Sequence, residues 1–372
     1  MNRAPATQGA PNALRGRWSW PDLTPALGCA GCRFKKPCGG MCVEAGDIDC
    51  LGECCGAPDV CVRACPKNPR GIVLAMREVG GTFDFDRVIP RADQLEPPAL
   101  PNEIALIDHR GSVAGPRALD WACLKLTAFF TRDGRLRFAD GVAMRGALGL
   151  DADTAILLSG IDQDADVEAW WGLGLVQRRL IIRAMPDFGI AMVTTPNFSL
   201  ALTEVRPTQM HAMSRIAITH HEFITSDVPA ALHLGAATER DYQRWAEFIA
   251  PRDEITHVAV DFSTGPARAE RRDFHLDCLR ALASRVGKPL QLIVKGRVDA
   301  IAPLAHSFAG VTYIDTTAFQ KTMRRRRLLI GANGEPRECA VTTALGEKLD
   351  DLWEQNWLAR QFFLARLREE AA

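Results

Sequence analysis

Most of the chain beyond position 151 alternates between short apolar runs and long amphipathic segments, and this rhythm limits the possible folds more than any other feature. Six runs of β-branched and aliphatic residues are clear. They span 154–159, 190–195, 230–234, 257–262, 290–294 and 311–315. Helical patterns lie between and after them, over 167–185, 209–225, 239–249, 268–286, 298–308 and 319–330. Strands that alternate with helices at this spacing build a parallel sheet.

The number of strand–helix units decides between a closed and an open sheet. Residues 103–108 are a further strand candidate and residues 71–79 a weaker one, which brings the count to seven or eight units. That count is enough to close a barrel. The alternative is an open doubly wound sheet, but no G-x-G-x-x-G follows any of the runs. We therefore predict an α/β fold: a TIM-like β/α barrel, regular or irregular, over 71–340, and a long helix in the C-terminal segment 341–372.

A dense cluster of cysteines precedes the predicted barrel. Nine of the twelve cysteines fall between positions 29 and 65, and the spacing C-x5-C-x3-C occurs twice. The nine are Cys29, Cys32, Cys38, Cys42, Cys50, Cys54, Cys55, Cys61 and Cys65. In a reducing compartment such a cluster indicates metal binding rather than disulfides. The natural count is two four-thiolate sites with one cysteine left over, in a module over 29–70 that follows a flexible tail at 1–28.

Two metals compete for these thiolates. The ending Cys61-x3-Cys65-Pro66 matches the close of a bacterial ferredoxin motif, which favours two iron–sulfur clusters of the [4Fe–4S] type. Structural zinc is the alternative because four thiolates also suit its tetrahedral geometry, although only Cys29 and Cys32 form a C-x2-C pair. Unmetallated thiols are the third interpretation. The C-x3-C-x2-C spacing of radical S-adenosylmethionine enzymes does not occur, so a structural or electron-relay centre is favoured.

Composition narrows the range of partners. The chain has 372 residues, 47% of them hydrophobic, and a formal net charge of zero. Balanced charge gives no overall attraction to nucleic acid or membranes, so any site for a charged ligand must be local. No apolar run approaches the roughly 20 residues that span a bilayer, and residues 1–17 lack the apolar stretch of a secretory signal. We therefore expect a cytoplasmic protein without a membrane partner.

Polar residues stand at the ends of the predicted strands, where the active sites of both parallel architectures lie. His233 and Lys295 directly follow apolar residues, and Asn197, Asp261 and Asp315 stand at the ends of three other runs. Such side chains can act as acid, base or nucleophile if they converge on one mouth. Asp315 is equally suited to cap the following helix. His233 and Lys295 are not caps, which makes them the stronger catalytic candidates.

Four consecutive arginines form the strongest local charge run. Arg324, Arg325, Arg326 and Arg327 lie in the last predicted helix before the C-terminal segment, with Lys321 one turn earlier. Arginine presents planar, bidentate donors that match phosphate oxygens, and late barrel segments often hold phosphate. The run is therefore a candidate site for a phosphate-bearing cofactor or nucleic acid. The alternative is a solvated helix face whose arginines pair with acidic residues of the C-terminal helix.

Several of these runs resemble the domain-of-unknown-function 4417 family. The resemblance rests on 157–161 (LLSGI), 195–199 (TPNFS), 233–234 (HL), 238–241 (TERD), 245–248 (WAEF) and 261–265 (DFSTG). The cysteine-rich leader ending at Cys65-Pro66 also resembles some members, so the likeness extends over residues 29–327. The family is found in phages, plasmids and bacterial mobile elements and has no established reaction. It implies a barrel, a mobile-element setting and a nucleotide or nucleic-acid substrate, but it transfers no catalytic roles.

Two functional hypotheses follow. The first is an iron–sulfur-containing barrel enzyme that acts on a nucleotide or nucleic acid. The second is a non-catalytic, metal-stapled scaffold that binds nucleic acid or a protein partner. The polar strand ends favour the first hypothesis, and the lack of a recognised catalytic signature favours the second. Convergence of His233, Lys295, Asp261 and Asn197 in one cleft would support the enzyme.

Overall fold

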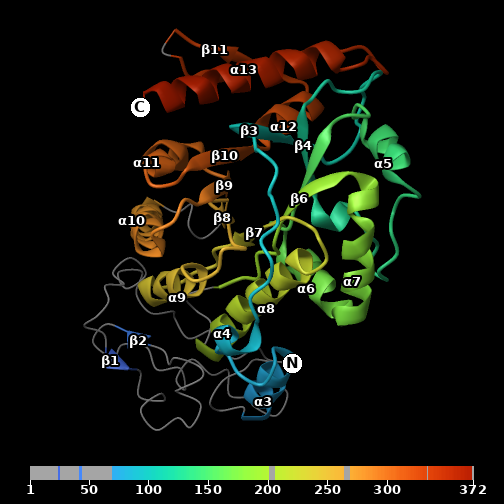
Figure 1. Cartoon of the computed structure of the whole chain (residues 1–372). Coiled ribbons are helices and arrows are strands. Elements are labelled where there is room, and N and C mark those ends of the chain that lie inside the picture. Colours follow the sequence, from blue (N-terminus) through green and yellow to red (C-terminus); the bar gives the residue numbers. More distant parts are fainter. Residues whose placement is uncertain are drawn as a thin grey trace, which may run out of the picture.

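The computed structural model describes residues 24–25, 42–43, 69–200, 206–263, 269–332 and 334–370 (Figure 1). The first two pieces are the short antiparallel strands β1 (Thr24–Pro25) and β2 (Cys42–Val43). Among the predicted metal ligands, Cys42 is described by its backbone in β2. The other ligands lie outside the described residues: Cys29, Cys32, Cys38, Cys50, Cys54, Cys55, Cys61 and Cys65. The iron–sulfur and zinc interpretations therefore both stay predictions.

Eight parallel strands close into a barrel in the order β10-β3-β4-β5-β6-β7-β8-β9. They are β3 (Glu103–Leu106), β4 (Trp121–Lys125), β5 (Ala155–Ser159), β6 (Ile190–Thr194), β7 (Ala230–His233), β8 (His257–Asp261), β9 (Gln291–Lys295) and β10 (Gly310–Asp315). The predicted TIM-like barrel is confirmed, because the six clear apolar runs coincide with β5 to β10 to within one residue at each end.

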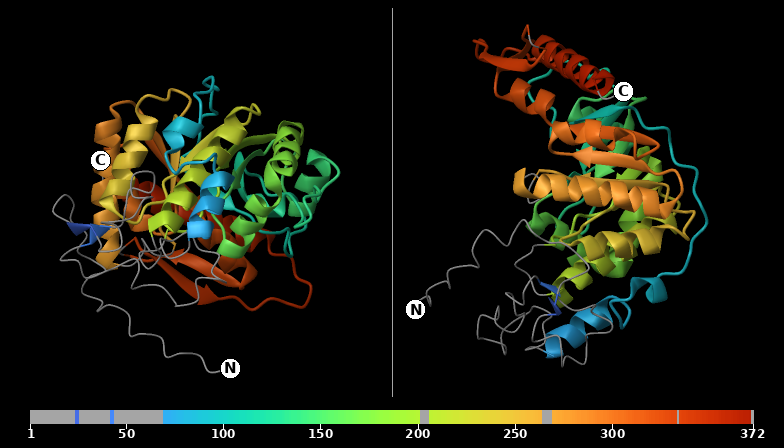
Figure 2. Two further views of the ribbon diagram at one scale, coloured as in Figure 1. Left: turned by 90° about the horizontal axis from the view of Figure 1, so that it is seen from below. Right: turned by 90° about the vertical axis from the view of Figure 1, so that its left-hand side faces the viewer.

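Helices cover the outside of the barrel (Figures 1 and 2). They are α5 (Gly141–Leu148), α6 (Asp164–Gly172), α7 (Gly174–Ala184), α8 (Arg206–Ile224), α9 (Glu239–Ile249), α10 (Ala269–Val286), α11 (Ile301–Ala305) and α12 (Thr317–Met323). The connection between β3 and β4, residues 107–120, contains no helix. The C-terminal helix α13 (Asp350–Glu369) covers this side instead, in contact with β3, α11 and α12. It lies across the top of the view in Figure 1.

The segment ahead of the barrel differs from the prediction. Residues 71–79, the weaker strand candidate, belong to helix α3 (Pro69–Glu78), so that prediction was wrong. Leu, Ala, Met, Arg and Glu in its second half are good helix formers, which outweighs the two β-branched residues before them. Glu78 at its end accepts hydrogen bonds from Trp171 Nε1 of α6 at 2.7 Å and pairs with His211 Nε2 of α8 at 2.8 Å. A short helix, α4 (Phe85–Val88), then packs against α8.

Apolar side chains form one layer inside the strands and another outside them. The inner layer consists of Ile104, Leu106, Cys123, Leu157, Met192, Ala231, Ala259, Ile293 and Ile314. The outer layer lies between the strands and the helices and includes large buried rings such as Trp170, Phe223 and Trp245. A barrel filled in this way is a packed core and not a pore. Space for chemistry is therefore left at the ends of the barrel.

The arginine run lies in a hairpin, so the helix predicted over 319–330 was wrong in its second half. Helix α12 ends at Met323, Arg325 adopts a positive φ of 52°, and β11 (Arg326–Ile330) pairs antiparallel with β12 (Pro336–Ala340). Asn356 of α13 holds this arrangement. Its Oδ1 accepts from Leu328 N at 2.7 Å, and its Nδ2 donates to Arg326 O at 2.8 Å. These tertiary contacts override the helical pattern of the local sequence.

A buried ion pair fastens α13 to the last barrel strand. The Asp315 carboxylate, at the end of β10, accepts from Arg360 Nε at 2.7 Å, and the two side chains are 0% and 5% exposed. The other carboxylate oxygen accepts from the backbone N–H groups of Thr317 and Ala318, both at 2.9 Å, and so caps α12. Among the described residues, no helix has the length and apolar character needed to cross a membrane.

Candidate active site at the barrel mouth

A layer of polar side chains faces the inside of the barrel at the carboxyl ends of its strands. Successive side chains of a strand point to opposite faces. In strands β3 to β9, the residue two positions beyond the last inner-layer residue is polar, and by the same alternation it points into the mouth of the barrel. We call this set the mouth layer. It consists of Asp108, Lys125, Ser159, Thr194, His233, Asp261 and Lys295.

The register of the strands agrees with this layer. Lys125 pairs with Ser159, which in turn pairs with Thr194 on the next strand. Asp261 of β8 pairs with Lys295 of β9. In-register neighbours of a parallel sheet point the same way, so Lys125, Ser159 and Thr194 share one face of the sheet, and so do Asp261 and Lys295. His233, Asp261 and Lys295 come from three successive strands, and both charged groups act on the His233 imidazole. Their role in catalysis stays a prediction.

Lys125 lies between two carboxylates on one side of the mouth. Its Nζ is 3.7 Å from Asp108 Oδ1 and 3.6 Å from Asp162 Oδ1. Asp162 follows β5, and its other oxygen accepts from Thr127 Oγ1 at 2.7 Å. The Asp162 side chain is only 6% exposed, so its charge needs these partners. The positive charge of Lys125 is therefore already balanced by the protein.

Lys295 extends across the mouth from the opposite side. Its Nζ donates to the carbonyl of Ile161 at 2.6 Å. Ile161 follows β5, which lies opposite β9 in the order of the eight strands. The ammonium thus meets a neutral acceptor there, whereas Lys125 is held by carboxylates. Lys295 is the mouth cation that is better placed to meet an anionic group of a ligand.

His233 is the buried titratable group of the mouth. Its side chain lies inside the barrel with the residue 6% exposed, and its Nδ1 atom has no hydrogen-bond partner. Burial lowers the pKa of its imidazole to about 4, while the nearby Asp261 carboxylate raises it and the Lys295 ammonium lowers it further. The ring is therefore neutral near pH 7. A neutral imidazole with an unpartnered nitrogen can accept a hydrogen bond or a proton from a bound molecule.

The loops that rim the mouth are held close to the strands. The Asn197 side-chain oxygen accepts from Asp162 N at 3.0 Å, which links the loop after β6 to the loop after β5. Gly160 N donates to Thr194 Oγ1 at 2.9 Å. A Cβ at Gly160 would come within 2.5 Å of the Thr194 carbonyl, so only glycine fits. Asn197 therefore lies at the rim and positions Asp162, one residue from the carbonyl that holds Lys295.

The remaining predicted site residues lie elsewhere. Asp315 points outward to Arg360 and α12, and it faces away from the mouth layer. Arg324, Arg325 and Arg326 are exposed at and around the start of the β11–β12 hairpin. Arg325 Nε donates to Thr343 Oγ1 at 2.6 Å. Within the described part of the chain, no ion pair joins the four arginines to acidic residues of α13, so both interpretations of the run stay open.

Sequence reasoning missed Asp108 and Lys125 as site residues. Asp108 follows β3, and Lys125 ends β4, whose five residues, Trp-Ala-Cys-Leu-Lys, follow a connection with no helix. The signal was present, because β4 ends in lysine after apolar residues just as β9 does, with Gln-Leu-Ile-Val-Lys. Below Lys125, burial raises the pKa of the Cys123 thiol to about 12. That cysteine is therefore a packing residue and not a nucleophile.

Comparison with known proteins gives no family for the chain. No protein-family model matches it, and no curated protein matches its sequence. Within the described residues, no three His, Cys, Asp or Glu side chains gather in a way that would hold a metal ion. The mouth layer is thus described by its own geometry: two lysines, three nearby carboxylates and one neutral histidine.

Proposed function

We propose that the chain is a β/α-barrel enzyme whose active site is the mouth layer. The observation that carries the proposal is the placement of His233, Asp261 and Lys295. They come from three successive strands, face the same inner side of the mouth, and include a buried imidazole nitrogen without a partner. Burying a polar atom without a hydrogen bond costs free energy. A bound ligand that forms a hydrogen bond with His233 Nδ1 would remove this cost.

The three side chains suit general acid–base chemistry on an anionic substrate. The neutral His233 imidazole would accept a proton or a hydrogen bond from the substrate. The Lys295 ammonium would stabilise negative charge on a neighbouring oxygen, since the mouth is partly removed from water and charge interactions are strong there. Asp261, in register with Lys295, would stabilise both the ammonium and an imidazolium formed at His233. Proton transfer at one atom beside a fixed cation is the reaction that this set supports best.

The proposed substrate class is a nucleotide or nucleic acid. Its phosphate would contact Lys295, because Lys125 is already balanced by Asp108 and Asp162. The nucleic-acid part of the proposal comes from the resemblance of 157–161, 195–199 and 261–265 to the domain-of-unknown-function 4417 family and its mobile-element setting. The arginine run Arg324–Arg327 would give a second, weaker contact to phosphates outside the mouth.

The test of the active site is binding and turnover measured side by side. A panel of nucleoside mono-, di- and triphosphates and short oligonucleotides would be screened by calorimetry, with products analysed by mass spectrometry. Lys295→Met and His233→Gln should abolish turnover, and Lys295→Met should also weaken binding at least about tenfold. Lys348→Met, an exposed lysine away from the barrel strands, is the matched control. Unchanged binding and turnover in both mouth variants would refute the site.

The cysteine-rich segment is proposed to hold two [4Fe–4S] clusters, with zinc as the alternative metal. Anaerobically purified protein should be brown, with broad charge-transfer absorption, iron and acid-labile sulfide. Replacing Cys38 or Cys61 with serine should lower the metal content, because a site that loses a thiolate holds its metal less tightly. Cys123→Ser, inside the barrel, is the control. Colourless protein with stoichiometric zinc would replace the iron–sulfur proposal with the zinc one.

A further inference from the structure

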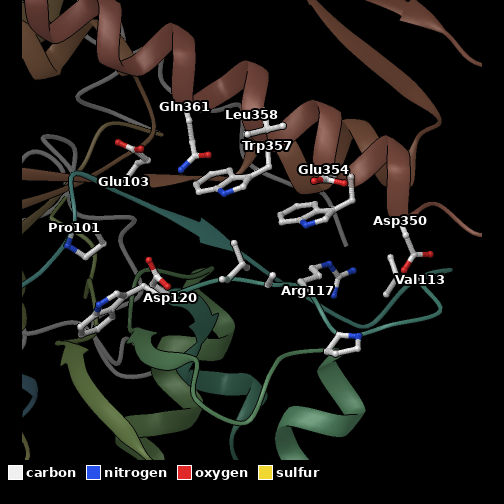
Figure 3. Close-up of a pocket in the computed structure, with 15 residues that line it drawn as sticks. Pro101, Glu103, Val113, Arg117, Asp120, Asp350, Glu354, Trp357, Leu358 and Gln361 are labelled. Atoms are coloured by element: carbon white, nitrogen blue, oxygen red, sulfur yellow. The ribbon is translucent and has the colours of Figure 1, made fainter.

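A groove of about 460 Å³ lies outside the barrel, between α13 and the segment that leads into β4 (Figure 3). Glu103, the first residue of β3, and Trp121, the first residue of β4, both line it. The groove therefore lies at the amino-terminal ends of these strands, away from the mouth layer. Its volume falls within the range of sites for small molecules, which is roughly 300–1,000 Å³.

One wall of the groove is aromatic. Trp353 and Trp357 of α13 stack in parallel, with ring centroids 6.2 Å apart and an angle of 5° between the planes. The guanidinium of Arg117 lies 5.2 Å from the Trp353 ring centroid. Arg117 is buried and is held in place by its hydrogen bonds to the carbonyls of Leu148 (2.8 Å) and Arg110 (2.6 Å). The wall thus already holds one cation that the chain itself supplies.

The second tryptophan of the wall has room for another cation. Trp357 is half-buried and lines the groove, as Figure 3 shows. Among the described residues, no guanidinium or ammonium group lies over its ring. The face of an indole ring is electron-rich and attracts cations placed within about 6 Å of its centre. The open part of the wall therefore offers the same kind of contact that Arg117 makes with Trp353.

The charges around the open part are negative. Glu103, Asp120 and Glu354 all line the groove. Burial raises the pKa of Glu103, while the nearby Arg368 charge and a hydrogen bond from Gln361 lower it. Asp350, at the end of the groove, is already engaged with the backbone N–H groups of Ala114 and Gly115. Glu354 is three residues before Trp357 on α13, close to one helical turn, whereas Arg117, the one arginine of the lining, is committed to backbone carbonyls.

We propose that this groove binds a small organic cation, whose ammonium or guanidinium group lies over Trp357 beside Glu354 and Glu103. The aromatic face and the carboxylates attract the same charge, and together they favour a cation over a neutral molecule of equal shape. Trp121 also packs against the inner layer of the barrel, so a bound ligand would touch the floor beneath the barrel interior. The site is separate from the proposed active site and does not depend on it.

Calorimetry with choline on the full-length chain tests the proposal. The neutral control is 3,3-dimethylbutan-1-ol, which has the shape of choline without its charge. Choline should bind, and the neutral alcohol should bind at least about tenfold more weakly. Trp357→Leu and Glu354→Gln should each weaken choline binding at least about fivefold. Glu354 is exposed, so its variant keeps the fold even if the tryptophan variant does not. Glu369→Gln, an exposed glutamate near the end of the same helix, should bind like the unmodified chain.

Three outcomes would overturn the proposal. The first is equal binding of choline and its neutral analogue, which would mean that charge is not recognised. The second is unchanged affinity in Glu354→Gln together with Trp357→Leu, which would place the ligand elsewhere. The third is no binding of choline or of agmatine, a guanidinium-bearing probe. If an arginine-rich peptide bound in that third case, the groove would belong to a protein partner and not to a small ligand.

Discussion

Removing one partner of the ion pair between Asp315 and Arg360 should be strongly destabilising, because both side chains are buried and the remaining charge would lose its partner. Replacing Arg360 with methionine keeps an unbranched side chain against Phe363, whose ring centroid is 5.1 Å from Cζ of Arg360, but removes the charge. Asp315 would keep its two backbone donors and lose only the Arg360 donor at 2.7 Å. Breaking a buried pair costs about 3–5 kcal/mol. Since one oxygen of Asp315 stays satisfied, we expect the lower end, about 3 kcal/mol.

A double-mutant cycle measures this contribution. Urea unfolding would be followed by tryptophan fluorescence and circular dichroism for Arg360→Met, Asp315→Asn and the double variant. The double variant should lose less unfolding free energy than the sum of the single variants, by at least about 1.5 kcal/mol. Arg366→Met is the matched control on the same helix, because its partners Glu335 and Glu370 are 53% and 60% exposed. Its loss should stay below about 1 kcal/mol. A cost below about 1 kcal/mol for Arg360→Met, or additivity in the cycle, would refute the buried pair.

Other perturbations give separate tests. His233 has a pKa of about 4 when folded and an ordinary value near 6.5 when unfolded, so the unfolded chain binds the extra proton first. The unfolding free energy should therefore fall as pH drops from about 6.5 towards 4, and urea titrations of His233→Gln should show a shallower fall. Gly296→Ala should distort the mouth and lower the melting temperature, because Gly296 has a φ of 103° and a Cβ there would come within 2.3 Å of the Phe262 backbone. A melting temperature that stays within roughly 1–2 °C of the unmodified chain would contradict this. Iodoacetamide mapped by mass spectrometry should label the half-exposed Cys339 and leave the buried Cys123 unlabelled until urea is added. Changing Arg324–Arg327 to glutamine should weaken binding of a short oligonucleotide and flatten its salt dependence; unchanged binding would make the run a solvated surface.

The strand–helix rhythm predicted most of the barrel because each unit carries its own local signal. In β8 and β9 a buried apolar run is followed directly by a charged residue, Asp261 or Lys295. A short stretch of sequence is therefore enough to predict both the strand and the residue at its end. Strand β4 was not predicted, because the connection before it has no helix and the alternation of strands and helices is absent there. Lys125, at the end of β4, was therefore not predicted as a site residue either. Its two carboxylate partners become neighbours only when β3, β4 and β5 are aligned in the sheet.

The arginine run shows why the local sequence pattern could not predict the structure around Arg324–Arg327. Residues 319–330 suit a helix as an isolated segment, and the helix does form up to Met323. Beyond it, pairing with β12 and the hydrogen bonds of Asn356 come from residues that are distant in sequence. Asp315 is a similar case, because capping and chemistry were both open and its partner Arg360 lies 45 residues further on. Side chains whose role depends on a distant partner are those that sequence reasoning assigns least well.

The position of α13 has a consequence for the order in which the molecule can be completed. The helix covers the side of β3 and β4, which are the first two strands of the barrel to leave the ribosome. Until residues 350–369 have been synthesised, Trp121 and the apolar residues near it lack their cover, even though all eight strands are present. Domains generally fold as units during synthesis. This barrel would therefore pass through a state in which its strands are closed but the side of β3 and β4 is uncovered, until α13 packs against it.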